Sequence, residues 1–156
     1  MDIRKATLDD MPAIQQIVQQ IWAIGSDFSL EEKYGAIGDE RWDRWLVPKV
    51  MSRLWDEMDQ LYVTEVDGQV AGFVSYAMSS ARKAGTIHYN GVSTAFRGRG
   101  IGTGQVQFAL DKFRQAGMEV AAVGTGMNEG HAPARAVYEK AGFEPLIEYR
   151  MYTMKL

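Results

Sequence analysis

The sequence predicts a single domain of the α/β (α+β) class, with helices packed on a mixed central sheet. Asp67-Gly68 separates two runs of alternating apolar residues, which is typical of an antiparallel hairpin. A strand-like segment at 86–93 continues through a glycine-rich loop and an amphipathic helix into the apolar run 120–125, the pattern of a parallel crossover. The chain has 156 residues and 46% hydrophobic content, which suits one domain over residues 1–156.

The N-terminal part of the chain predicts one strand and a first helix. Residues 2–6 have the character of a short strand, and Thr7 with Asp10 forms the pattern of a capping box. The helix that follows carries one apolar stripe at helical spacing. The stripe consists of Ile14, Ile17, Val18 and Ile21.

Residues 26–38 show little periodicity, so we expect a loop or a short irregular helix there. Residues 39–58 predict the second helix, because their large apolar side chains fall near one face. Pro48 should kink or split this helix, since an interior proline removes a backbone hydrogen bond and clashes with the preceding turn.

The rest of the chain alternates strands with two further helices. Strands are expected at 61–66, 69–76, 86–93 and 120–125, one helix ends at Gly117, and a last helix runs from near His131 to Gly142. Residues 143–156 predict two more short strands, the second over 148–154. The predicted element order is β-α-α-β-β-β-α-β-α-β-β.

Composition excludes several classes of protein and site. A formal net charge of -3 argues against non-specific nucleic-acid binding, and the absence of a long apolar run or leader favours a cytoplasmic protein without membrane contact. The chain has no cysteine, which excludes disulfides, thiolate metal sites and an S-acyl enzyme. Its two histidines are too few for a histidine-rich metal site, so no metal is expected.

The loop between the strand at 86–93 and the next helix has the character of an anion site. Arg97 and Arg99 lie beside glycines just before a helix start, where N–H groups and the positive dipole end would hold a pyrophosphate. The alternative is a glycine-rich turn with solvated arginines. A dinucleotide fingerprint lacks its third glycine here, and neither Lys-Ser nor Lys-Thr occurs for a Walker loop.

Two motifs together resemble a known family. Residues 97–102, Arg-Gly-Arg-Gly-Ile-Gly, fit the pattern R/Q-x-x-G-x-G/A, and residues 131–143 are similar to N-x-x-A-x-x-L-Y-E-K-x-G-F. Both motifs and the element order resemble the GNAT superfamily of N-acetyltransferases. The resemblance implies the GNAT fold with strands splayed at the CoA site, acetyl-CoA as the acyl-donor cosubstrate, and a possible homodimer.

The resemblance also implies roles for individual residues. Residues expected at the CoA site are Val92, Thr94, Arg97, Gly98, Arg99, Gly100, Ile101, Gly102, Thr103, Asn128, His131 and Arg135. Tyr138 stands where the family has the tyrosine that protonates the departing thiolate. Without the motif, Tyr138 would be interpreted as a core tyrosine. His131 replaces the family's usual asparagine, so either His131 or Asn128 is expected to contact the pantetheine arm.

The general base is open, because the strand before the loop lacks the glutamate that many relatives carry. Strand alternation predicts Thr86, His88 and Asn90 on one face, and His88 is the candidate base since imidazole titrates near neutral pH. The alternative is a half-exposed strand histidine. Weaker candidates are Glu31, Glu32 and Glu65.

The expected activity is acetyl transfer from acetyl-CoA to a primary amine of a small molecule, by direct attack in a ternary complex. Tyr34, Trp42 and Trp45 are candidate walls of the acceptor site, whereas the alternative for the tryptophans is ordinary core. Two other functions stay open from the sequence: acetylation of a protein or peptide, and a non-catalytic CoA-binding sensor.

Overall fold

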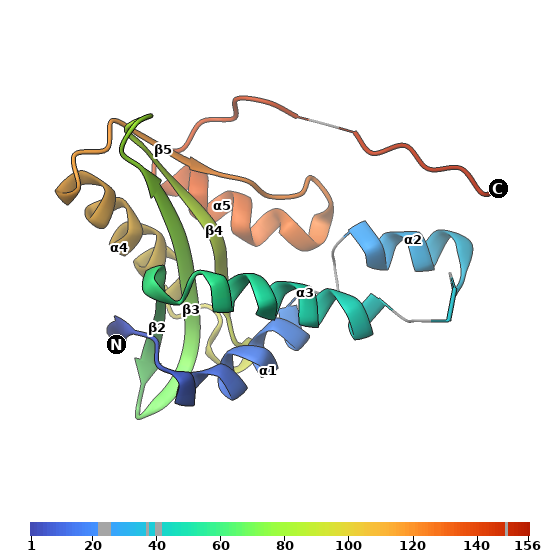
Figure 1. Ribbon diagram of the computed structural model, residues 1–156, viewed down its shortest axis with the longest axis horizontal. Helices are drawn as coiled ribbons and strands as arrows, with labels where there is room; N and C mark the ends of the chain where they lie inside the picture. The colour runs from blue at the N-terminus through green and yellow to red at the C-terminus, as the bar shows by residue number, and fades with distance from the viewer. Residues whose placement is uncertain (22–25, 37, 40–41, 149) are drawn as a thin grey trace.

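The computed structural model describes residues 1–156 except 22–25, 37, 40–41 and 149, without the side chains of residues 26–29 and 42–45 (Figure 1). The strands are β1 Asp2–Lys5, β2 Leu61–Val66, β3 Gln69–Ser79, β4 Ala84–Val92 and β5 Val120–Val123. The helices are α1 Met11–Ile21, α2 Ser26–Tyr34, α3 Trp42–Asp56, α4 Ile101–Gln115 and α5 Ala132–Lys140. Short 3-10 turns lie at Leu8–Asp10, Met58–Gln60, Thr94–Phe96 and Glu129–His131.

The strands described form one mixed sheet in the order β1-β2-β3-β4-β5, which confirms the predicted fold class. Neighbouring strands are antiparallel from β1 to β4, and β5 runs parallel to β4 as the crossover predicts. The turn between β2 and β3 has positive φ at both Asp67 (51°) and Gly68 (74°), the geometry that lets a two-residue hairpin follow the sheet twist.

Helices cover both faces of the sheet and each face has its own core (Figure 1). The α1 and α3 side chains pack with Leu61, Val63 and Phe73 on one face. The α4 side chains pack with Val74, Tyr76 and Ile87 on the other, and α5 adds partly buried contacts there. Of the described residues, none belongs to a helix with the length and apolar character needed to cross a bilayer.

The structure decides between the alternatives for one helical prediction and corrects another. Residues 26–34 form the helix α2, where the sequence left a loop or a short irregular helix open. The predicted helix at 39–58 is shorter, Trp42–Asp56, and Pro48 lies inside one continuous helix without splitting it. The apolar positions Leu46, Val47, Val50 and Leu54 are buried against the sheet, and this packing holds the helix together across the proline.

The predicted strands at the C-terminal end were wrong for the residues described. Residues 143–148 and 150–156 form no strand, and Leu146, Ile147, Tyr152 and Met154 are exposed. The segment instead approaches α2, where the hydroxyls of Thr153 and Tyr34 lie 2.9 Å apart. Alternating apolar residues indicate that a segment can form a strand. Whether it does so also depends on a sheet edge close enough for hydrogen bonding, which is decided by the tertiary structure.

A bidentate ion pair ties β1 to the start of α1. Arg4 donates from Nη1 and Nη2 to the two carboxylate oxygens of Asp10, both at 2.8 Å, and the Thr7 N–H also donates to Asp10 at 2.8 Å. The Arg4 hydrogen bonds lower the pKa of Asp10 from 3.8 to about 2, against the opposing effect of burial.

Replacing this carboxylate, Asp10→Asn, should lower the free energy of unfolding by about 2 kcal/mol at pH 7. Because the folded pKa lies below the unfolded value, the stabilisation is complete above about pH 4 and is lost as the pH falls through about 2. Urea denaturation at pH 7 and pH 2 measures this, with Asp9→Asn as the exposed control. An equal deficit of Asp10→Asn at both pH values would contradict the linkage.

Candidate active site

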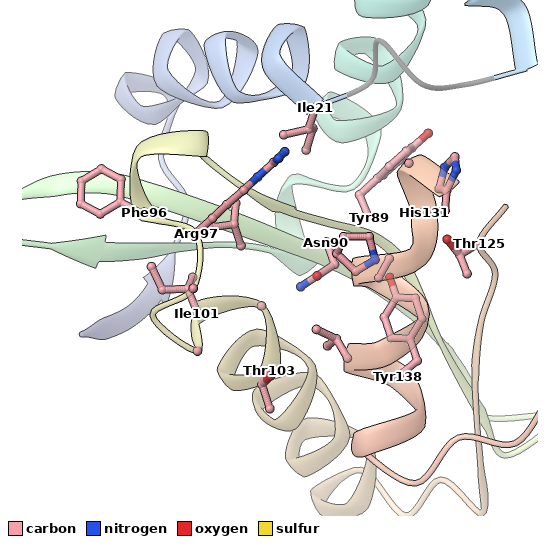
Figure 2. A pocket seen from close by; sticks show the side chains of 18 of the residues that line it. Ile21, Tyr89, Asn90, Phe96, Arg97, Ile101, Thr103, Thr125, His131 and Tyr138 are labelled. Atoms are coloured by element: carbon pink, nitrogen blue, oxygen red, sulfur yellow. The ribbon is translucent and has the colours of Figure 1, made fainter. Parts of the chain in front are cut away.

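A cavity of about 500 Å³ opens where β4 and β5 part (Figure 2). The two strands pair only from Ala84↔Val120 to Ile87↔Val123, and β4 continues to Val92 beyond the end of β5. From His88 onward, this edge of β4 therefore has no strand beside it in the described part of the chain, and the cavity lies along it. The lining residues are Ile21, His88, Tyr89, Asn90, Val92, Phe96, Arg97, Gly98, Gly100, Ile101, Gly102, Thr103, Gly124, Thr125, Gly130, His131, Pro133, Ala134, Val137 and Tyr138.

His88 occupies a β-bulge in β4. In the ladder with β3, Ser75 pairs with Tyr89 and Tyr76 pairs with Ile87, so His88 is the extra residue without a Cα partner. A bulge shifts the alternation of side chains by one position and often re-aims a side chain at a functional site. The bulge therefore changes the face of the sheet on which the residues after His88 place their side chains.

The prediction that Thr86, His88 and Asn90 share one face was wrong for Asn90. His88 Nδ1 lies 2.7 Å from Glu57 Oε1, just after α3 on one face of the sheet. Asn90 Nδ2 instead donates to Gln105 Oε1 of α4 on the other face, at 2.8 Å. Strict alternation fails here because the bulge inserts one residue, and no local sequence pattern reveals it.

Glu57 was not identified from the sequence. It follows the last residue of α3, and its side chain is only 11% exposed. Its carboxylate also accepts hydrogen bonds from Ser75 Oγ at 2.8 Å and from Arg53 Nε at 2.5 Å. Burial raises the pKa of Glu57, but these hydrogen bonds outweigh it and the net shift is downward, so the carboxylate is ionised at neutral pH.

The start of α4 forms one end of the cavity. Gly98 and Gly100 both have φ +77°, a left-handed conformation that favours glycine. The first hydrogen bond of the helix runs from the Gly104 N–H to the Gly100 carbonyl, so the amides of residues 101–103 have no acceptor within the helix. These N–H groups, the helix dipole and Arg97 in the lining make this end suitable for an anion.

Tyr138 extends from α5 into the cavity (Figure 2). Its ring packs edge-on against Phe143, with centroids 6.1 Å apart. Burial raises the pKa of the phenol above its usual value of 10.0, which keeps it protonated at neutral pH. No hydrogen bond joins the Tyr138 hydroxyl to another residue within the described ranges, so the proton is available to a bound molecule.

His131 lines the cavity from the turn before α5, and Asn128 holds it in place. The Oδ1 atom of Asn128 is hydrogen-bonded to Nδ1 of His131, which places the proton of a neutral ring on Nδ1. Burial, followed by the nearby Arg135 charge, lowers the pKa of His131, so the neutral ring is favoured. The remaining nitrogen, Nε2, can accept a hydrogen bond from an amide such as those of a pantetheine arm.

Several residues predicted for the CoA or acceptor sites lie outside the cavity lining. The Thr94 N–H donates to Gln20 Oε1 at 3.2 Å, and Arg99 packs over the Phe96 ring at 5.2 Å. Arg135 donates to the carbonyl oxygens of residues 126 and 128, so it shapes the loop before α5.

Of the predicted acceptor walls, Tyr34 has a described side chain, and it is not part of this lining. The Tyr34 hydroxyl is paired with Thr153 instead of facing the cavity. The side chains of Trp42 and Trp45 lie outside the described residues. Within the residues that the structure does describe, no His, Asp and Glu cluster is arranged to hold a metal ion.

Comparisons with known proteins agree with this architecture. A family model described as the acetyltransferase (GNAT) family matches residues 22–143. An uncharacterized N-acetyltransferase of Methanocaldococcus jannaschii is 29% identical over 148 residues, which are 91% of this chain but only 60% of that protein's length. The chain thus spans less than two thirds of this relative's length.

Solved structures show the same fold. The PaiA N-acetyltransferase of Thermoplasma acidophilum in complex with coenzyme A superposes with a TM-score of 0.71 at 15% identity, covering 92% of this chain and 89% of that one. A ribosomal-protein-alanine N-acetyltransferase of Brucella melitensis gives 0.65 at 23% identity, covering 92% and 85%. The family model spans most of the sequence and the fold agrees with it, so the chain belongs to the acetyltransferase (GNAT) family.

Proposed function

We propose that this protein transfers an acetyl group from acetyl-CoA to a primary amine of a small molecule. The observation that carries the proposal is one cavity lined by an anion-binding helix start, a histidine and a protonated tyrosine. The amides of residues 101–103 with Arg97 would hold the pyrophosphate of CoA, and the open edge of β4 would lie along the pantetheine arm. Nε2 of His131 would accept a hydrogen bond from a pantetheine amide.

The transfer step uses His88 as the base and Tyr138 as the acid. The neutral amine nitrogen attacks the thioester carbon, and His88 takes the proton that this nitrogen loses as the C–N bond forms. A C–N bond forms, the C–S bond breaks, and the sulfur receives the proton of the Tyr138 hydroxyl. Solvent later returns a proton to Tyr138 and removes one from His88. Direct attack by the amine is favoured because the chain has no cysteine to carry the acetyl group.

The acceptor is the least specified part of the proposal. A small amine that is cationic at neutral pH fits the net charge of -3 better than an acidic acceptor does. The Brucella melitensis protein of similar fold is named for a ribosomal protein acceptor, so a protein or peptide acceptor is the second candidate. A homodimer and a cytoplasmic location stay predictions.

Release of the CoA thiol across a panel of acceptors tests the function. We expect release from acetyl-CoA with at least one small amine among polyamines, aminoglycosides and amino acids. Release with peptides alone would replace the small-molecule acceptor with a peptide one. Tight CoA binding without release for any acceptor would favour the non-catalytic sensor.

A further inference from the structure

Glu57 and His88 are brought together only by the fold. They are separated by 31 positions in the chain and belong to the α3 end and to β4. Glu57 is fixed on both sides, since its N–H donates to the Arg53 carbonyl at 3.1 Å and its carbonyl accepts from the Gln60 N–H at 2.8 Å. His88 is fixed by the bulge, which breaks the ladder at that single residue. The backbone of Glu57 and the position of His88 in β4 are therefore both fixed where the carboxylate contacts the imidazole.

The exposure of the side chains distinguishes this contact from a surface ion pair. The Arg53 side chain is 56% exposed, whereas those of Glu57 and His88 are 11% and 23% exposed. Ser75, which pairs across the ladder with the residue after His88, donates to the second Glu57 oxygen. Both carboxylate oxygens thus have donors, and Oε1, which His88 contacts, has a defined orientation.

We propose that Glu57 is the positioning residue of His88: its carboxylate accepts the Nδ1 proton, so that the neutral ring offers Nε2 to the cavity. An ionised carboxylate can only accept hydrogen bonds, which places the ring proton on Nδ1. When His88 takes the amine's proton on Nε2, the Nδ1–H bond to Glu57 persists and stabilises the imidazolium. This inference rests on the proposed role of His88 in acetyl transfer.

Other charged and titratable groups surround the pair. Arg53 of α3 partly neutralises Glu57, and Tyr89, the neighbour of His88 in β4, lines the same cavity. Burial, and then the Glu57 charge, raises the pKa of Tyr89, which keeps that phenol neutral. Tyr138 and His131 face the cavity from the α5 side. Glu57 is thus the acidic group in direct contact with the His88 ring.

Kinetics of Glu57→Gln test the proposal, because this change removes the charge and nearly keeps the shape. We expect turnover to fall about 10- to 100-fold. His88→Ala should lower turnover at least as much, and adding Glu57→Gln to it should cause little further loss, since the two residues act as a unit.

The matched control is Glu119→Gln. Glu119 is an exposed glutamate just before β5 that accepts from Lys83 Nζ at 2.6 Å, and it lies outside the cavity lining. We expect this variant to keep the wild-type turnover. If Glu57→Gln kept the same turnover as Glu119→Gln, the positioning role would be overturned.

A second measurement does not depend on activity. The chain has two histidines, so nitrogen NMR of labelled protein, with a His131→Gln variant for assignment, resolves the His88 ring. The neutral ring should carry its proton on Nδ1 in the wild type and lose that preference in Glu57→Ala. A wild-type ring protonated on Nε2 would overturn the pairing. Absence of thiol release by the wild-type protein would instead reject the proposed function, while the NMR result still decides the pairing.

Discussion

Tyr138→Phe should lower the turnover of acetyl transfer by about 100-fold and leave CoA affinity little changed. The substitution removes the hydroxyl and retains the ring, which packs against Phe143 in the cavity wall. In the proposed mechanism the hydroxyl acts only when the sulfur leaves, so its loss should raise the barrier of the transfer step without weakening the bound state. Steady-state thiol release and CoA titration measure the two quantities separately.

The pH dependence gives Tyr138 a second signature. Burial raises the pKa of this phenol above 10.0, so an acid role predicts that wild-type activity declines only at a higher pH, where the proton is lost. In Tyr138→Phe the remaining activity should lack this decline. Tyr62→Phe is the control, since Tyr62 lies outside the cavity lining, and it should keep the wild-type turnover. Unchanged turnover in Tyr138→Phe would remove the hydroxyl from the mechanism.

Features encoded by short stretches of sequence were predictable. The hairpin at Asp67-Gly68 depends on two residues that adopt positive φ, and the structure has them there. The loop at 97–102 and the helix after it depend on glycines at Gly98 and Gly100 and on the apolar stripe of α4. Tyr138 was singled out because a motif fixes its spacing, and the structure places it in the cavity, although its role stays a proposal.

Features that depend on contacts between distant segments were not predictable. Glu57 follows a helix end with no pattern that connects it to His88, and the bulge that turns His88 toward it appears only in the pairing of β3 with β4. Likewise, the alternation at 148–154 suggested a strand, but the described residues there form none. Periodicity reports which face of an element is apolar, whereas pairing partners are decided by the assembled fold.

Gly72 is a further position where the fold imposes a requirement that sequence alone does not reveal. It lies in β3 between its partners Thr64 and Val92, close to α4. A Cβ at Gly72 would lie 2.5 Å from the Gly91 carbonyl oxygen and 2.6 Å from Gln105 Nε2. The first atom is backbone in the neighbouring strand and cannot move without disturbing the ladder.

The second atom belongs to a buried polar chain. Gln105 is fully buried, donates to Thr64 Oγ1 at 2.9 Å and accepts from Asn90 at 2.8 Å. If Gln105 moved away from a new Cβ, Thr64 and Asn90 would lose their partner, and leaving buried polar groups unpaired is unfavourable. Asn90 also lines the cavity, so the disturbance would reach the candidate CoA site.

Gly72→Ala should therefore lower the free energy of unfolding by about 3 kcal/mol, the upper range for overpacking, as measured by urea denaturation. Gly124→Ala is the matched control, because nothing lies within 4 Å of the Cβ that it would add. Equal stability of Gly72→Ala and Gly124→Ala would show that β3 and β4 are packed less tightly at this point than the geometry requires.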